Sequence, residues 1–144
     1  MKDKRECDTR TSVKELVKEG DAAKGIGKYQ LAIINYNRAL ESTDDVYAKY
    51  IVSRLSSCYR KLNQPNKALE IYHNALNQYG ITINDPVVLT SVSGAYCDLK
   101  RWDEALNCAN YACELDDGEI NEFLDAVYNR IENNRSYYER WQFA

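Results

Sequence analysis

The chain has 144 residues, of which 44% are hydrophobic and 28% are charged, and its formal net charge at pH 7 is −3. A chain of this length and composition can bury one shared core, which argues against a wholly disordered protein and against two ordinary domains. The small negative charge argues against a nucleic-acid surface, because phosphate binding requires clustered positive charge.

The N-terminus, the lack of long apolar runs and the cysteines indicate a cellular compartment for the protein. Residues 1–11 mix both charge signs without apolar periodicity, so we expect a disordered leader there. No apolar run approaches the roughly 20 residues that cross a bilayer, and we therefore expect a cytoplasmic protein without membrane insertion. The five cysteines show no Cys-x-x-Cys spacing, which favours reduced thiols over disulfides or a zinc site.

The first predicted elements form a helical hairpin. Ser12 followed by Glu15 fits a capping box, which predicts a helix that begins at Ser12 and ends at about Gly25. Gly27 is expected to take a positive φ in the turn. A second helix then covers about 29–41, with apolar residues at three- and four-residue steps.

Four more helices follow with their own start and stop signals. Pro65 suits the first position of a helix, Gly80 is a natural terminator, and Asp85 before a proline offers an N-cap. The predicted helices cover about 46–62, 66–78, 86–99 and 102–115.

Small residues recur at a fixed spacing along these helices. Ala68 follows Ala32 by 36 residues and Ala105 follows Ala68 by 37, and each has an alanine seven residues later. Such a period is typical of stacked helical hairpins. The last apolar stripe, which predicts one more amphipathic helix, consists of Ile120, Phe123, Leu124, Val127 and Ile131.

Three segments in register resemble the tetratricopeptide repeat family. The matching residues are Leu16, Glu19, Gly20, Ala23, Ala32, Tyr36 and Ala39, then Val52, Leu55, Ser56, Tyr59, Ala68, Tyr72 and Ala75, then Leu89, Val92, Ser93, Tyr96, Ala105, Ala109 and Ala112. The closing prolines of the family pattern are missing, with Asp44, Gly80 and Asp117 in their places. The resemblance implies an all-α fold: a right-handed superhelix of three helical hairpins with a terminal solvating helix. It places a single domain at 12–144, with repeats at about 13–46, 49–82 and 86–119 and a capping helix at about 119–142.

The same resemblance implies a concave groove for a segment of a partner protein. The groove positions are Lys14, Val17, Asp21, Lys24, Tyr50, Ser53, Arg54, Ser57, Arg60, Thr90, Gly94 and Cys97. Some family members grip an acidic C-terminal tail with several cations, of which only Arg54 has a counterpart here, so we expect no binding of such a tail. Tyr50 and Arg60 are the expected anchors, because aromatic residues and arginine dominate binding hot spots. Tyr50 can equally be a residue that only packs against a neighbouring helix.

The sequence therefore predicts a non-enzymatic adaptor that binds a peptide or helix of another protein. One alternative is a small secretion-type or assembly chaperone. Another is a scaffold or homodimer that self-associates through Tyr137, Tyr138, Trp141 and Phe143 at the aromatic C-terminal end. His73 is the only histidine, and no nucleophile, base and cofactor motif occur together, so we expect no catalytic residues, cofactor or metal site.

Overall fold

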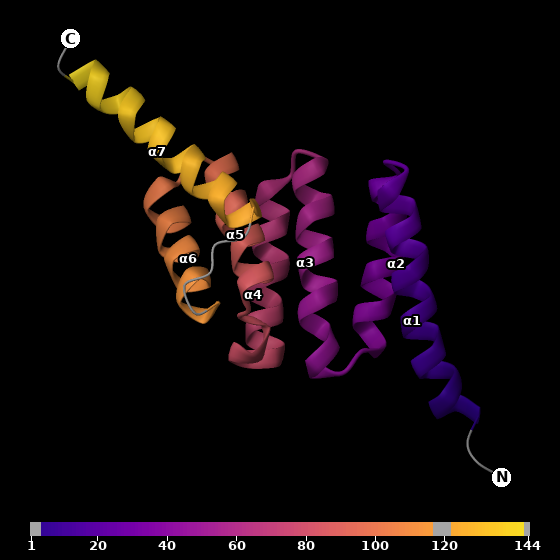
Figure 1. Cartoon of the computed structure of the whole chain (residues 1–144). Coiled ribbons are helices and arrows are strands. Elements are labelled where there is room, and N and C mark those ends of the chain that lie inside the picture. The colour runs from indigo at the N-terminus through magenta and orange to yellow at the C-terminus, as the bar shows by residue number, and fades with distance from the viewer. Residues whose placement is uncertain (1–3, 117–121, 143–144) are drawn as a thin grey trace. The chain divides into compact units, whose positions relative to one another are not determined.

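The computed structural model describes residues 4–116 and 122–142, and it places the side chains of 13–44, 47–116 and 122–134. The described residues form seven α-helices and one 3₁₀ helix, without a strand (Figure 1). The elements are α1 (Lys4–Gly25), α2 (Tyr29–Ser42), α3 (Asp45–Lys61), α4 (Pro65–Tyr79), η1 (Gly80–Ile83), α5 (Pro86–Asp98), α6 (Trp102–Leu115) and α7 (Glu122–Gln142). They divide into two compact units, residues 1–84 and 85–144.

The first unit consists of two helical hairpins. Figure 1 shows α1 beside α2, with α3 next to α2 and then α4. The Asp44 carboxylate caps α3 by accepting a hydrogen bond from the Tyr47 amide, and Pro65 begins α4 as its sequence position predicts. Gly80 ends α4 with a φ of 69°. The linker that follows it winds into η1, which packs against α3 and α4.

One backbone geometry recurs in the turn of every hairpin. Gly27, Asn63 and Lys100 have φ values of 80°, 60° and 59°, and they are separated by 36 and 37 residues, the same spacing as the alanines. In each turn the next residue donates its N–H to the carbonyl five positions earlier, at 2.8–2.9 Å. This six-residue frame satisfies carbonyls that the end of a helix would otherwise leave without a partner. The positive φ expected at Gly27 is therefore confirmed, and the turn repeats with asparagine and lysine in the same place.

The core of the first unit depends on a close contact between α1 and α2. Tyr36 is fully buried, and its ring packs against the backbone at Gly20, which has no side chain to block it. A Cβ at residue 20 would lie 2.6 Å from Cε1 of Tyr36. The buried residues of this core are Val13, Val17, Ala23, Ala32, Ile33, Tyr36, Ala39, Ile51, Leu55 and Cys58. The small residues Gly20, Ala32 and Ala39 of the repeat pattern are all buried in this core.

The second unit consists of a hairpin, α5 and α6, with α7 packed against both helices. Ala105, Ala109 and Ala112 on α6 are fully buried, and the Ser93 hydroxyl on α5 donates to the Ala105 carbonyl at 2.6 Å. The face of α7 that is buried carries Leu124, Val127 and Ile131.

Three sequence-based expectations need correction or fall outside the described residues. Helix α1 begins at Lys4, not at Ser12, because residues 4–11 contain good helix formers and no glycine or proline, so the expected leader is helical from Lys4. Phe123 does not join the buried stripe of α7, since it lies about 100° round the helix from Leu124 and remains 76% exposed. Ile120 and the expected start of the capping helix lie in 117–121, outside the described residues. The division into one domain at 12–144 stays a prediction.

We predict that Gly20→Ala destabilises the protein by about 1–3 kcal/mol, because the added methyl group overlaps a buried ring that cannot move into solvent. Gly25→Ala is the matched control, since no atom lies within 4 Å of its Cβ position. Urea unfolding followed by circular dichroism would measure both variants. Equal unfolding midpoints for the two variants would contradict the proposed contact.

Candidate functional site

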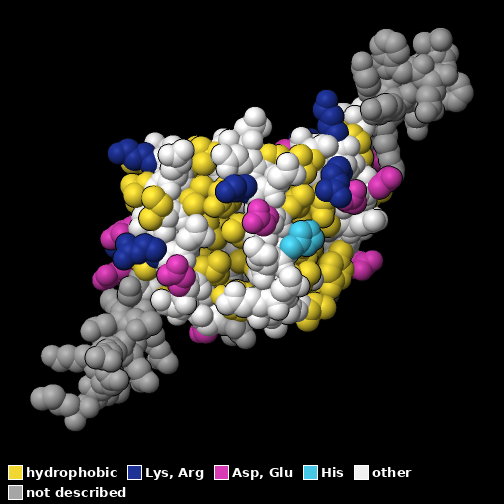
Figure 2. Space-filling view, turned by 180° about the vertical axis from the view of Figure 1, so that it is seen from behind, with side chains coloured by type: hydrophobic (Ala, Val, Ile, Leu, Met, Phe, Trp, Pro, Cys, Tyr) yellow, Lys and Arg dark blue, Asp and Glu magenta, His cyan; other side chains and the backbone are white. Residues whose placement is uncertain are grey.

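On one face of the described surface, the positive charges are dispersed. On the face shown in Figure 2, the described Lys and Arg side chains stand apart, with acidic and apolar side chains between them. That spacing is unlike the clustered positive charge that binds phosphate backbones. Among the described residues, no helix is long and apolar enough to cross a membrane, and no three potential metal ligands come together.

The structure separates the expected groove residues into exposed and buried sets. Val17 belongs to the core of the first unit, and Thr90, Gly94 and Cys97 on α5 are also buried. Two helices, α6 and α7, pack on α5 and leave little of it exposed, which is why the groove positions expected there offer no surface. The remaining groove positions are exposed or half-buried on α1 and α3, namely Lys14, Asp21, Lys24, Tyr50, Ser53, Arg54, Ser57 and Arg60.

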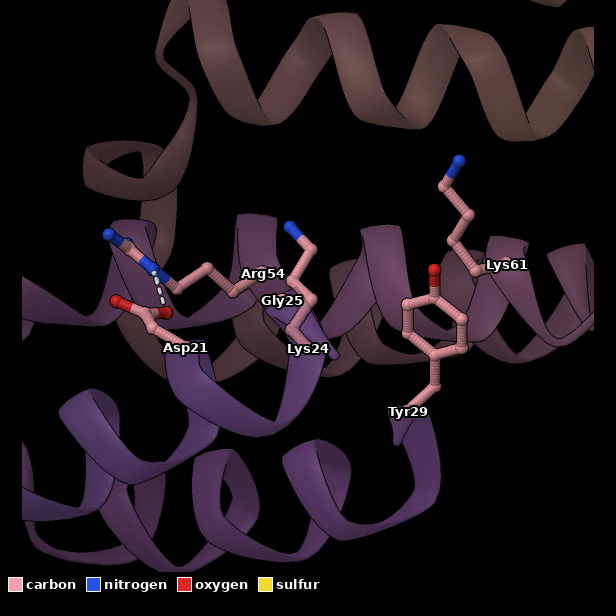
Figure 3. A pocket seen from close by; sticks show the side chains of 6 residues that line it. All are labelled: Asp21, Lys24, Gly25, Tyr29, Arg54 and Lys61. Carbon is pink, nitrogen blue, oxygen red and sulfur yellow. Dashed lines mark hydrogen bonds and ion pairs between the residues drawn. The ribbon is translucent and has the colours of Figure 1, made fainter. Parts of the chain in front are cut away.

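Part of this α1 and α3 surface forms an open hollow of about 330 Å³. Its lining residues are Asp21, Lys24, Gly25, Tyr29, Arg54 and Lys61. Figure 3 shows the Lys24 and Lys61 side chains and the Tyr29 ring pointing to the same side, with the Asp21 and Arg54 pair at the other end. Three of the six, Asp21, Lys24 and Arg54, were expected at the groove.

The other three lining residues were missed by sequence reasoning. Gly25 and Lys61 stand one position beyond the last expected groove position of their helices, and Tyr29 begins α2. The signal was present, because Lys24 and Lys61 both lie in the last turn of a helix that is followed by the repeated turn. The expected groove positions ended at Lys24 and Arg60, and the three missed residues follow them, where one helix ends or the next begins.

Asp21 connects the hollow to the core. Its Oδ1 accepts hydrogen bonds from the buried Tyr36 hydroxyl and from Nε of Arg54, the latter at 2.9 Å. Nη1 of Arg54 also donates to the Tyr50 carbonyl at 3.1 Å, which fixes the guanidinium along α3. Burial, and then the hydrogen bond and charge of Asp21, raise the pKa of Tyr36 far above its usual value, so this hydroxyl stays a donor.

Tyr50 lies on the surface of α3 with 44% of its area exposed. Its ring is tilted against Tyr47 at a centroid distance of 5.7 Å, and Nζ of Lys49 lies 5.2 Å from its centroid. Both neighbours are on α3 itself, so these contacts orient the ring while the residue stays partly exposed.

The described cysteines are free thiols. Burial raises the pKa of Cys58, and burial together with the nearby Glu104 raises the pKa of Cys108 to about 11. A nucleophilic cysteine requires the opposite shift, because the thiolate is the reactive form. Neither thiol therefore has the character of a nucleophile, and Cys58 is fully buried whereas Cys108 is half-buried.

Comparison with known proteins identifies the fold. No family model and no curated protein sequence matches the chain. The structure resembles the crystal structure of the Sgt2 TPR domain from Aspergillus fumigatus, with a TM-score of 0.77 and 18% sequence identity, over 89% of this chain and 82% of that one. The chain thus has the all-α fold of a tetratricopeptide repeat domain, as its sequence pattern predicted. At 18% identity, the likeness concerns the fold alone.

We predict that Asp21→Ala lowers the free energy of unfolding by about 1–3 kcal/mol, because it leaves the buried Tyr36 hydroxyl without its acceptor. Adding Tyr36→Phe removes that hydroxyl, so the double variant should be more stable than Asp21→Ala alone. Urea unfolding of the single and double variants would measure the difference. A double variant less stable than Asp21→Ala would show that the hydroxyl has found another acceptor.

We predict that alkylation of Cys108 by iodoacetamide accelerates by about tenfold per pH unit between pH 8 and pH 10, because its thiol ionises only near pH 11. Mass spectrometry of the digested protein would follow the reaction at this residue. The alkylation rate of a small model thiol in the same solution should stop rising at a lower pH. If the rate at Cys108 stopped rising at the same pH as the model thiol, the pKa of Cys108 would not be raised.

Proposed function

We propose that the chain is a non-enzymatic protein-interaction module that binds a peptide or helix of a partner across the α1 and α3 surface of its first unit. The tetratricopeptide repeat fold supports a role in binding, since this architecture presents extended surfaces for other chains. The observation that carries the proposal is the grouping of exposed Tyr50 with Arg54 and the hollow on one surface. Tyrosine and arginine are the side chains enriched at binding hot spots.

The layout of this surface indicates how a partner segment would lie. The guanidinium of Arg54 donates from Nε to Asp21 and from Nη1 to the Tyr50 carbonyl. Because these bonds already orient the side chain, little rotamer entropy is lost when a partner contacts it. Tyr50 is oriented in the same way by its neighbours on α3. A segment that reaches from Tyr50 along α3 to the hollow would therefore meet side chains that are already positioned.

The other interpretations of the sequence stay predictions. Self-association was expected through Tyr137, Tyr138, Trp141 and Phe143, whose side chains lie outside the described residues. A role as a secretion-type or assembly chaperone would use the same surface on a single dedicated partner, and the cytoplasmic location is likewise a prediction.

We predict that Ser57→Glu/Arg60→Glu weakens capture of the partner by about tenfold or more, because it places negative charge and bulk on the α3 surface. A pull-down from native lysate with quantitative mass spectrometry would measure capture, after circular dichroism confirms that the variant is helical.

The matched control is Lys67→Glu/Asn74→Glu, which makes the same change in charge at exposed positions of α4. A partner retained by the wild type and this control, and lost by the α3 variant, would support the proposal. Equal loss from both variants would contradict it, and equal capture by all three would place the binding surface elsewhere.

A further inference from the structure

The hollow between α1 and α3 has a charge opposite to that of the whole chain. Three cationic side chains and one carboxylate line it, so its lining carries an excess of two positive charges, whereas the chain has a net charge of −3. The one carboxylate, Asp21, is already bonded to Arg54 and to the Tyr36 hydroxyl. The excess therefore resides on Lys24 and Lys61.

Neither lysine forms an ion pair with any residue that the structure describes. Figure 3 shows their side chains extending to the same side of the hollow as the Tyr29 hydroxyl. Two ammonium groups and a hydroxyl together offer several donors to one acceptor group. The volume of about 330 Å³ equals the space of about ten water molecules, which is ample for a group larger than a carboxylate.

The position of Lys24 and Lys61 also has a simpler explanation, which does not involve a ligand. Both stand in the last turn of a helix, where a cation interacts favourably with the helix dipole. That explanation accounts for each lysine separately. It does not account for the presence of both, from two different helices, in the lining of one hollow whose only carboxylate is already bonded.

We propose that the hollow binds a doubly charged phosphoryl group carried by the partner segment. A phosphorylated side chain brings a charge of about −1.5 to −2 and three acceptor oxygens, which matches the charge excess and the donors of Lys24, Lys61 and Tyr29. This inference rests on the proposed function, because the partner segment is the molecule that would carry the phosphoryl group. The subsite lies at the C-terminal ends of α1 and α3, beside the repeated turns.

The probe is inorganic phosphate, titrated into the whole ¹⁵N-labelled chain at constant ionic strength with chloride as the balancing ion. We expect saturable shifts of the amide signals in the two adjoining turns, residues 25–29 and 61–64. Sodium acetate should bind at least about tenfold more weakly, because it carries half the charge. Lys24→Gln/Lys61→Gln should weaken phosphate binding by at least about tenfold.

The matched control is Lys18→Gln/Lys67→Gln, which removes two exposed lysines of the same unit outside the hollow. Phosphate should also raise the thermal unfolding midpoint of the wild type and of this control relative to chloride, and leave that of Lys24→Gln/Lys61→Gln unchanged. This comparison separates anion binding from the helix dipole, because each variant is compared with itself in two salts.

Three outcomes of the titration would overturn the proposal: no saturable shift in the two turns, equal affinity for acetate and phosphate, or equal weakening in the control variant. Phosphatase treatment of the lysate before the pull-down tests the source of the group. Loss of capture by the wild type supports a phosphorylated partner. Unchanged capture would overturn that assignment while the proposed binding surface still stands.

Discussion

The contact between the Tyr36 ring and the bare backbone at Gly20 is the constraint on which the first unit depends. It allows α1 and α2 to approach until the ring is fully buried, and it directs the phenol hydroxyl out of the core toward Asp21. Asp21 in turn holds Arg54 on α3. One tyrosine therefore joins the packing of the first hairpin to the arrangement of a charged side chain on the second.

The same chain of contacts explains why the hollow is positively charged. An unbonded aspartate beside Lys24 would compete with any entering anion for the ammonium group of that lysine. Because Asp21 accepts from both Tyr36 and Arg54, its charge is already compensated and its orientation is fixed. The surface proposed to bind a partner is thus organised from the core outward, because the buried Tyr36 helps to hold the Asp21 and Arg54 side chains on it.

The sequence predicted the features that depend on local chemistry and regular spacing. The alanines at a seven-residue interval are buried, and the Asp85 cap and the turn at Gly27 occur as expected. Features that depend on tertiary neighbours were harder to predict. Val17 and the expected groove positions of α5 are buried because of what packs around them, and Phe123 is exposed because one position changes its direction by about 100°. Lys61 and Tyr29 join the hollow only through the close approach of α1, α2 and α3.

The three hairpin turns share one hydrogen-bonding frame although glycine, asparagine and lysine occupy its left-handed position. For lysine that conformation is strained by about 1–3 kcal/mol, so Lys100 does not itself favour the bend. The buried faces of α5 and α6 must hold that turn closed. What repeats in the turns is therefore a backbone geometry and not one residue type. The same frame can thus be built from different residues, as a TM-score of 0.77 at 18% identity also illustrates for the fold as a whole.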